Sequence, residues 1–134
     1  MPLANIFTEE VEFKVIKRVN NLNKDSQGQW GKMSVSQMLT HCNVTFEMTY
    51  DDIHSNPTGL RKFIMRYLIK DRIVNETPYH KNGRTAPQFV MTASKDFQLE
   101  KNRFTDYVIK TQELGKHYFD KKESHSFEVL NKTE

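Results

Sequence analysis

The stretch Ser34–Tyr50, with the sequence SVSQMLTHCNVTFEMTY, decides the fold of this chain. It opens on a capping-box pattern, in which the Ser34 hydroxyl accepts from the backbone N–H of Gln37 and the Gln37 side chain accepts from the backbone N–H of Ser34. A largely apolar stripe follows at helical spacing and consists of Val35, Met38, Leu39, Cys42, Phe46 and Thr49. The cap and the stripe together predict an amphipathic helix from residue 34 to about residue 50.

Three further segments show a helical pattern. Residues 8 to 22 begin at Thr8, a good N-cap, and repeat apolar residues at Val11, Val15, Val19 and Leu22. Residues 94 or 96 to 114 end before Gly115, which suits a C-cap. Residues 59 to 73 carry apolar positions at helical spacing, namely Leu60, Phe63, Ile64, Tyr67 and Leu68.

The segments between these helices read as loops. Trp30 lies between two glycines, and we expect its ring to plug one end of a helical bundle. Pro78, Gly83 and Pro87 break residues 74 to 92 into an irregular crossover, in which Phe89–Met91 forms either a short extended piece or a plug. Three long helices and one shorter one predict an all-α fold of the antiparallel-bundle type.

Composition narrows the class of protein. The chain has 134 residues and 15.9 kDa, which corresponds to a single domain over residues 1–134. No apolar run exceeds three residues, whereas a membrane span needs about 20. The N-terminus lacks a secretory-signal pattern, and the single cysteine, Cys42, fits a reducing compartment. The net charge of +3 is too balanced to indicate nucleic acid. We therefore expect a cytoplasmic protein with neither nucleic acid nor membrane among its partners.

Several short motifs carry a resemblance to a known family. Residues 29–33, QWGKM, and 37–42, QMLTHC, resemble the signature of an uncharacterised bacterial branch of the DinB-like superfamily, known as a domain of unknown function. Residues 85–89, TAPQF, resemble a second conserved stretch of that branch. Asp96–Phe97 with Glu100–Lys101, and His125–Phe127, resemble its DFxxEK helix and HPxFG turn.

The resemblance implies a DinB-like four-helix bundle with a long crossover between its second and third helices. It also implies a divalent metal, Ni, Zn or Fe, held by one histidine of the second helix and an HxxxH pair of the last. His41 matches the second-helix ligand, whereas the HxxxH pair has no counterpart before Glu134. Ser126 stands where the family has proline after its histidine. We therefore expect a domain that is C-terminally incomplete relative to the family, with one metal ligand of three.

Other candidate residues have more ordinary readings. Asp51, Asp52 and His54 follow the second helix and are metal-ligand types, but their spacing favours solvated loop residues, as it does for His80, His117 and His125. Cys42 is either a reactive thiol or, as its place in the apolar stripe favours, a core residue. The basic segment 61–72, RKFIMRYLIKDR, fits a nucleic acid, an anionic membrane surface or a partner, but a solvated helix face is the usual meaning of such charges.

Three functions follow from these residues. The first is a divalent-metal-dependent enzyme of thiol S-transferase, hydrolase or isomerase type, acting on a small molecule or thiol, with His41 as a metal ligand. The second is a non-catalytic helical binding module that forms a homodimer through an exposed bundle seam. The third is a small-molecule carrier with an apolar pocket between helices. Its pocket would be lined by Tyr50, Tyr67, Phe97, Phe104 and Tyr107.

Overall fold

The computed structural model describes residues 3–124 and 128–129, and its three long helices begin where the sequence predicts. Helix α1 (Glu9–Asn20) starts at Thr8, whose hydroxyl accepts from the backbone N–H of Val11. Helix α2 (Val35–Tyr50) carries the complete capping box between Ser34 and Gln37. Helix α5 (Phe97–Leu114) is capped by the Asp96 carboxylate and ends at Gly115, whose φ of 73° suits a residue without a side chain.

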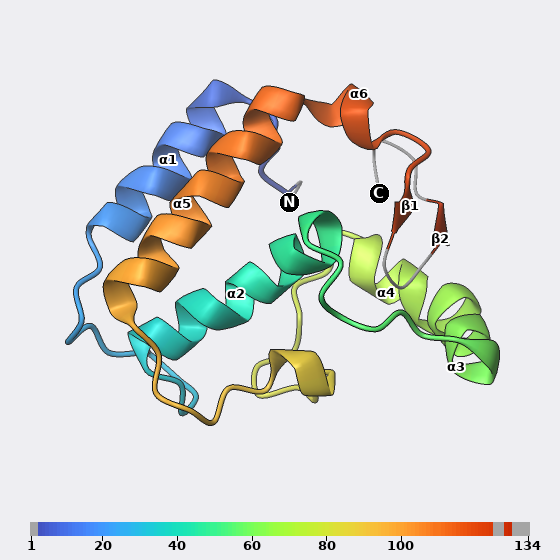
Figure 1. Cartoon of the computed structure of the whole chain (residues 1–134), viewed down its shortest axis with the longest axis horizontal. Helices are drawn as coiled ribbons and strands as arrows, with labels where there is room; N and C mark the ends of the chain where they lie inside the picture. Colours follow the sequence, from blue (N-terminus) through green and yellow to red (C-terminus); the bar gives the residue numbers. More distant parts are fainter. Residues whose placement is uncertain (1–2, 125–127, 130–134) are drawn as a thin grey trace.

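Helix α5 is the middle helix of the body. Its extensive contacts are with α1 on one side and with α2 on the other (Figure 1). The buried apolar side chains come from all three helices and are Val19, Val35, Leu39, Val44 and Val108. The fold is therefore predominantly helical, as predicted, while the described residues form an open three-helix arrangement rather than a closed four-helix bundle.

Residues 59–74 form a separate helical arm. The sequence predicts one regular helix here, but the segment consists of α3 (Gly59–Ile64), a π-helical turn η1 (Met65–Ile69) and α4 (Lys70–Val74). The extensive contacts of α3 and α4 are with η1 of the same segment (Figure 1). The arm thus departs from the expectation that its apolar positions join the bundle core.

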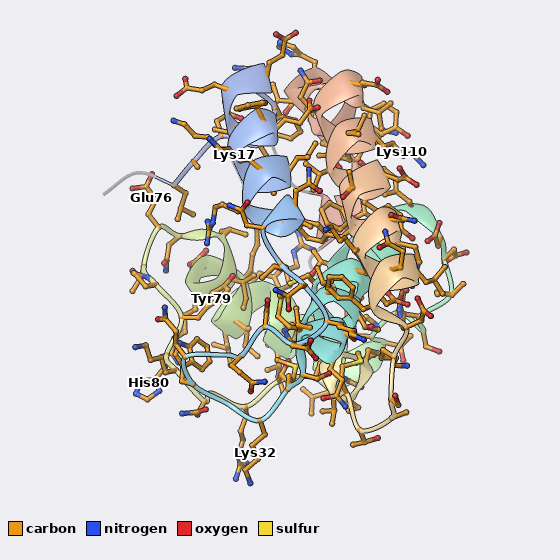
Figure 2. The ribbon with its side chains drawn as sticks, turned by 90° about the vertical axis from the view of Figure 1, so that its left-hand side faces the viewer. Lys17, Lys32, Glu76, Tyr79, His80 and Lys110 are labelled. Atoms are coloured by element: carbon orange, nitrogen blue, oxygen red, sulfur yellow. The ribbon has the colours of Figure 1, made fainter. Side chains whose placement is uncertain are left out.

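The loops differ from the sequence-based expectation at two places. Trp30 does not plug the bundle, because its side chain is 56% exposed and its nearest cation is the Lys81 ammonium, 6.0 Å above the ring. Phe89 lies in a short 3-10 turn, η2 (Pro87–Phe89), so the extended alternative for Phe89–Met91 is wrong. The plug alternative agrees with the half-buried Phe89, whose ring centroid lies 5.3 Å from that of His41 on α2, although Val90 is exposed. Figure 2 shows Lys32 projecting away from the body, from the same loop as Trp30.

The chain continues after α5 into elements that the sequence does not predict. Helix α6 (Lys116–Phe119) places the Phe119 ring against the rings of Phe7 and Tyr50. Two short antiparallel strands follow, β1 (Glu123–Ser124) and β2 (Glu128–Val129). His125, the first residue of the expected HPxFG-like turn, lies outside the described residues. Of the helices that the structure describes, none has the length and apolar character needed to cross a membrane.

Candidate functional site

His41 lies on α2 and contacts Phe89 of the crossover between residues 74 and 92. Its Nδ1 is 2.9 Å from the carbonyl oxygen of Phe89, and the two rings lie with centroids 5.3 Å apart. A carbonyl oxygen only accepts, so Nδ1 carries the proton in this contact. The neutral ring then keeps a lone pair on Nε2, which has no hydrogen-bond partner in the described part of the chain. His41 is therefore oriented as histidine ligands of metals commonly are, with the second nitrogen held by a backbone carbonyl.

The remaining ligands of a metal site are not assembled around His41. Across residues 3–124 and 128–129, no group of three or more His, Cys, Asp or Glu side chains is placed to hold an ion. A metal site of the expected kind needs about three protein ligands. His41 fits as one ligand, but the described residues do not complete the set, and the metal site stays a prediction.

Cys42 is a poor candidate for a reactive thiol. Burial raises the pKa of its thiol above the ordinary value, so the thiolate is scarce at neutral pH. The Sγ atom lies 3.9 Å from the sulfur of Met38, one turn earlier on α2. The geometry agrees with the reading of Cys42 as a packed residue.

A buried polar cluster, which the sequence analysis does not predict, lies between α2 and α5. Four side chains form its centre: Asn43, Glu47, Glu100 and Arg103. Asn43 is fully buried, and its Nδ2 donates to the Glu100 carboxylate at 2.9 Å and to the Glu100 carbonyl at 3.1 Å. The guanidinium of Arg103 bridges the two carboxylates, because Nη2 donates to Glu47 and Nη1 donates to Glu100 at 3.0 Å.

Loop residues extend this cluster. His54 Nε2 lies 2.7 Å from Glu47 Oε2, and the Tyr107 hydroxyl donates to the Asp51 carboxylate. The expectation that His54 is a solvated loop residue is therefore wrong, because its ring is packed against the buried carboxylate of Glu47. Asp51 is exposed, yet it is tied to α5 through Tyr107. Neither residue is placed next to His41 as a further metal ligand.

The electrostatics of the cluster favour a structural latch over an acid–base site. Burial works to raise the pKa of Glu47, but hydrogen bonds from Arg103 and His54 outweigh it and hold the pKa below the ordinary value. Burial works to lower the pKa of Arg103. This effect is outweighed by the hydrogen bonds to Glu47 and Tyr107 and by the charge of Glu100, so the pKa of Arg103 lies above its ordinary value. The lowered pKa keeps the Glu47 carboxylate charged at neutral pH, where it accepts from Arg103 and is bonded to His54. Such a cluster aligns the two helices.

A signal for this cluster exists in the sequence, but it is weak. Val35, Leu39, Asn43 and Glu47 recur every four residues and are all buried. The predicted stripe of α2 shares Val35 and Leu39 with this row, and its other members Met38, Cys42 and Phe46 are half-buried while Thr49 is exposed. The Asn43–Glu47 and Glu100–Arg103 pairs occupy a packed face, yet polar residues at such spacing are usually solvated.

The aromatic residues proposed to line one pocket are divided among three places. Tyr50 and Tyr107 stack with centroids 6.0 Å apart, and Phe104 joins them through Phe46. Tyr67 lies on the arm beside Phe63, and Phe97 contacts Lys101 one turn along α5. The five rings therefore do not form the single carrier pocket that the sequence suggested.

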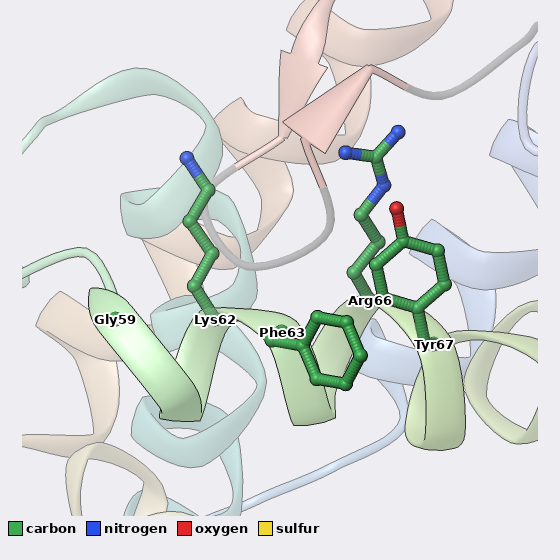
Figure 3. Close-up of a pocket in the computed structure, with 5 residues that line it drawn as sticks. All are labelled: Gly59, Lys62, Phe63, Arg66 and Tyr67. Atoms are coloured by element: carbon green, nitrogen blue, oxygen red, sulfur yellow. The ribbon is translucent and has the colours of Figure 1, made fainter.

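A shallow, open pocket lies instead on the arm (Figure 3). Its lining residues are Gly59, Lys62, Phe63, Arg66 and Tyr67. The Phe63 and Tyr67 rings lie with centroids 4.7 Å apart, and the Arg66 guanidinium is 5.2 Å from the Tyr67 ring centroid. The pocket continues into an exposed apolar surface, which we call the arm face: Leu60, Phe63, Ile64, Tyr67 and Leu68.

Comparisons with known proteins add no relative: no family model, no curated protein and no solved structure matches the chain. The resemblance to the DinB-like superfamily therefore stays a prediction from the motifs.

Proposed function

We propose that this protein is a non-catalytic helical interaction module whose binding surface is the arm face. One observation carries the proposal: the arm turns its apolar side outward. Leu60, Tyr67 and Leu68 are 74%, 59% and 66% exposed, while Met65, Ile69 and Lys70 of the same segment are half-buried. An amphipathic helix that packs on its own protein shows the reverse orientation. The arm face is thus suited to a surface outside the described chain.

The cost of leaving this face in water supports the same conclusion. Full burial of a Leu, Ile or Phe side chain contributes about 1.5–3 kcal/mol, and the arm face offers several such side chains at once. Large contiguous apolar patches on a protein surface mark interaction sites.

The proposal is tested by the native size of the protein in extracts of cells that express it. We expect the wild type to migrate above its 15.9 kDa monomer. The Phe63→Ser/Leu68→Ser double variant should migrate as the monomer, because it removes two exposed anchors of the arm face. Phe13→Ser/Leu99→Ser is the matched control, since both residues are exposed outside the arm. A wild type that migrates only as a monomer contradicts the proposal.

The homodimer expected from the sequence belongs to this proposal, as does the cytoplasmic location. The homodimer expected from the sequence forms through an exposed seam of the bundle. The open packing of α1 and α2 on α5 supports such a contact. Sedimentation of the purified protein over a range of concentrations tests it directly. A single monomeric species at every concentration contradicts the homodimer and leaves a different partner for the arm face.

A second candidate function is the divalent-metal-dependent enzyme of thiol S-transferase, hydrolase or isomerase type. The observation that favours it is the His41 Nδ1 contact with the Phe89 carbonyl, which leaves Nε2 as the free lone pair of the ring. Imidazole nitrogen suits nickel, zinc and iron, and such an ion supplies Lewis-acid activation of a bound water or thiol. The described residues supply this one ligand, so no catalytic step is derived from them.

A further inference from the structure

We propose that two loops of this protein together form a binding surface for single-stranded nucleic acid. One loop joins α1 to α2, and the other joins α4 to η2. The loops meet where the Lys81 ammonium lies 6.0 Å from the centroid of the Trp30 ring. We call this surface the loop patch, and its exposed residues are Trp30, Lys32, Tyr79, His80, Lys81 and Arg84. It shares no residue with the arm face, so the inference goes beyond the proposed function and does not depend on it.

The loop patch is basic in a chain whose charges are otherwise nearly balanced. The chain has no acidic residue between Asp25 and Glu47, and none between Glu76 and Asp96. These two stretches contain four Lys or Arg residues, namely Lys32, Lys81, Arg84 and Lys95. The net charge of +3, from which we expected no nucleic acid, describes the whole chain and not this local surplus. A basic cluster on one surface is the electrostatic footprint of nucleic-acid binding.

The cations of the loop patch are available to phosphate groups. The side chains of Lys32 and Arg84 are exposed, and neither forms an ion pair or a hydrogen bond in the part of the chain that the structure describes. Figure 2 shows Lys32 and His80 projecting away from the body, one from each loop, with Glu76 apart from both. A phosphate oxygen can therefore accept from these cations without displacing a carboxylate of the protein.

Trp30 and Tyr79 supply flat rings beside these cations. Their side chains are 56% and 69% exposed. The Tyr79 hydroxyl donates to the Ile73 carbonyl at 2.9 Å, which orients that ring while most of it stays in solvent. Bases stack on exposed aromatic rings whatever their sequence, and each stacked base strengthens binding by about fivefold or more. A strand that stacks a base on Trp30 also meets the Lys81 ammonium, because the two groups are in contact.

A turn in the second loop sets the order of rings and cations. The Gly83 N–H donates to the His80 carbonyl at 3.2 Å and closes the turn. Because such a turn reverses the chain, Lys81 lies near its tip, while Tyr79 and Arg84 follow at its two ends. Rings and cations therefore alternate over a short surface. A single strand presents bases and phosphates in the same alternation.

This combination of rings and cations favours a single strand over other polyanions. In a duplex the bases stack on one another, so their faces are not offered to Trp30 and Tyr79. An acidic peptide or a lipid headgroup supplies negative charge but no base to stack on the two rings. Binding that requires both the rings and the cations is therefore specific to the proposed partner.

Fluorescence anisotropy of a labelled strand of about 12 uridines, titrated with the purified protein, tests the inference. We expect saturable binding at about 50 mM salt, with a slope of log affinity against log salt of about −2, as three phosphate contacts require. Lys32→Gln/Arg84→Gln should reduce the slope to about −0.7, because only Lys81 remains. Trp30→Ala should weaken binding by about fivefold or more, whereas Trp30→Phe should lose less because it keeps a ring.

Two matched controls lie outside both loops. Lys17→Gln/Arg18→Gln removes two exposed cations of α1, and Phe13→Ala removes an exposed ring of the same helix, so both should bind like the wild type. A DNA strand of the same length identifies which type of strand binds more tightly. Failure of the wild type to bind either strand at about 50 mM salt would overturn the inference. So would equal affinities of Trp30→Ala and Phe13→Ala, or equally tight binding of a duplex or a polyglutamate peptide.

Discussion

The rings of Phe63 and Tyr67 lie with centroids 4.7 Å apart on the arm, and 55% and 59% of their respective side chains remain exposed. The two rings therefore contact each other while more than half of each stays exposed. A binding surface held in this way is already formed before a partner arrives, which lowers the ordering cost of association.

The first prediction concerns the stability of the free protein. Because the arm face contributes little to the core, Phe63→Ser/Leu68→Ser should change the free energy of unfolding by no more than about 1 kcal/mol. Leu39→Ala should cost about 2–5 kcal/mol, because Leu39 is almost fully buried and leaves a cavity. Urea denaturation followed by circular dichroism measures both values. A loss from the arm variant as large as that from Leu39→Ala would mean that the arm packs on the body.

The second prediction concerns the latch between α2 and α5. Arg103→Met leaves the buried carboxylates of Glu47 and Glu100 without their shared donor, and we expect a loss of about 1–3 kcal/mol. A double-mutant cycle with Glu47→Gln should give a clear coupling energy, since the two side chains are in contact. The exposed Glu10–Lys14 pair is the control, and its cycle should give a coupling energy close to zero, because water screens the two charges. Additive losses at Glu47 and Arg103 would contradict the latch.

The third prediction is a dependence of stability on pH. The pKa of Glu47 in the folded protein lies below its ordinary value of 4.5, so the unfolded chain binds a proton at this site more readily. Glu47 therefore stabilises the fold above pH 4.5, and this contribution is lost as the pH falls through the lower folded pKa. Stability curves measured from neutral to acid pH should flatten in Glu47→Gln. A variant whose curve stays parallel to that of the wild type would contradict this assignment.

The fourth prediction concerns His41 and separates the two candidate functions. If the protein is a metalloenzyme, the natively expressed chain should carry nickel, zinc or iron, and His41→Ala should remove it. His80→Ala is the control, because His80 is exposed and bonds only to the carbonyl of its neighbour Lys81 among the described residues. Elemental mass spectrometry of both variants gives the answer. Metal that persists in His41→Ala would rule out His41 as a required ligand.

The helices could be predicted because their signals are local. Thr8, Ser34 and Asp96 each satisfy a backbone donor within three residues, so the start of each long helix depends on its own sequence. Gly115 ends α5 for an equally local reason. These features fix where helices form and say little about what they pack against.

Packing and polar burial could not be predicted in the same way. The helical spacing of the apolar residues on the arm predicts a face that is buried in the core. A sequence pattern cannot show that these side chains stay exposed in the described part of the chain. Asn43 on α2 and Glu100 on α5 are buried because they meet between the two helices. These two residues are 57 positions apart in the chain, and neither helix alone signals the pairing. Trp30 was expected in the core for its size, but the loop that carries it holds the ring in solvent.

The central claim is that a partner covers the arm face, and footprinting with a side-chain-modifying carbene or radical tests it most directly. The purified monomer and the protein in extracts of its expressing cells should be labelled under the same conditions. We predict strong labelling of Phe63, Tyr67 and Leu68 in the purified monomer and protection of these three in the extract, while Phe13 and Leu99 are labelled equally in both. Equal labelling of the arm face in both samples would contradict the account.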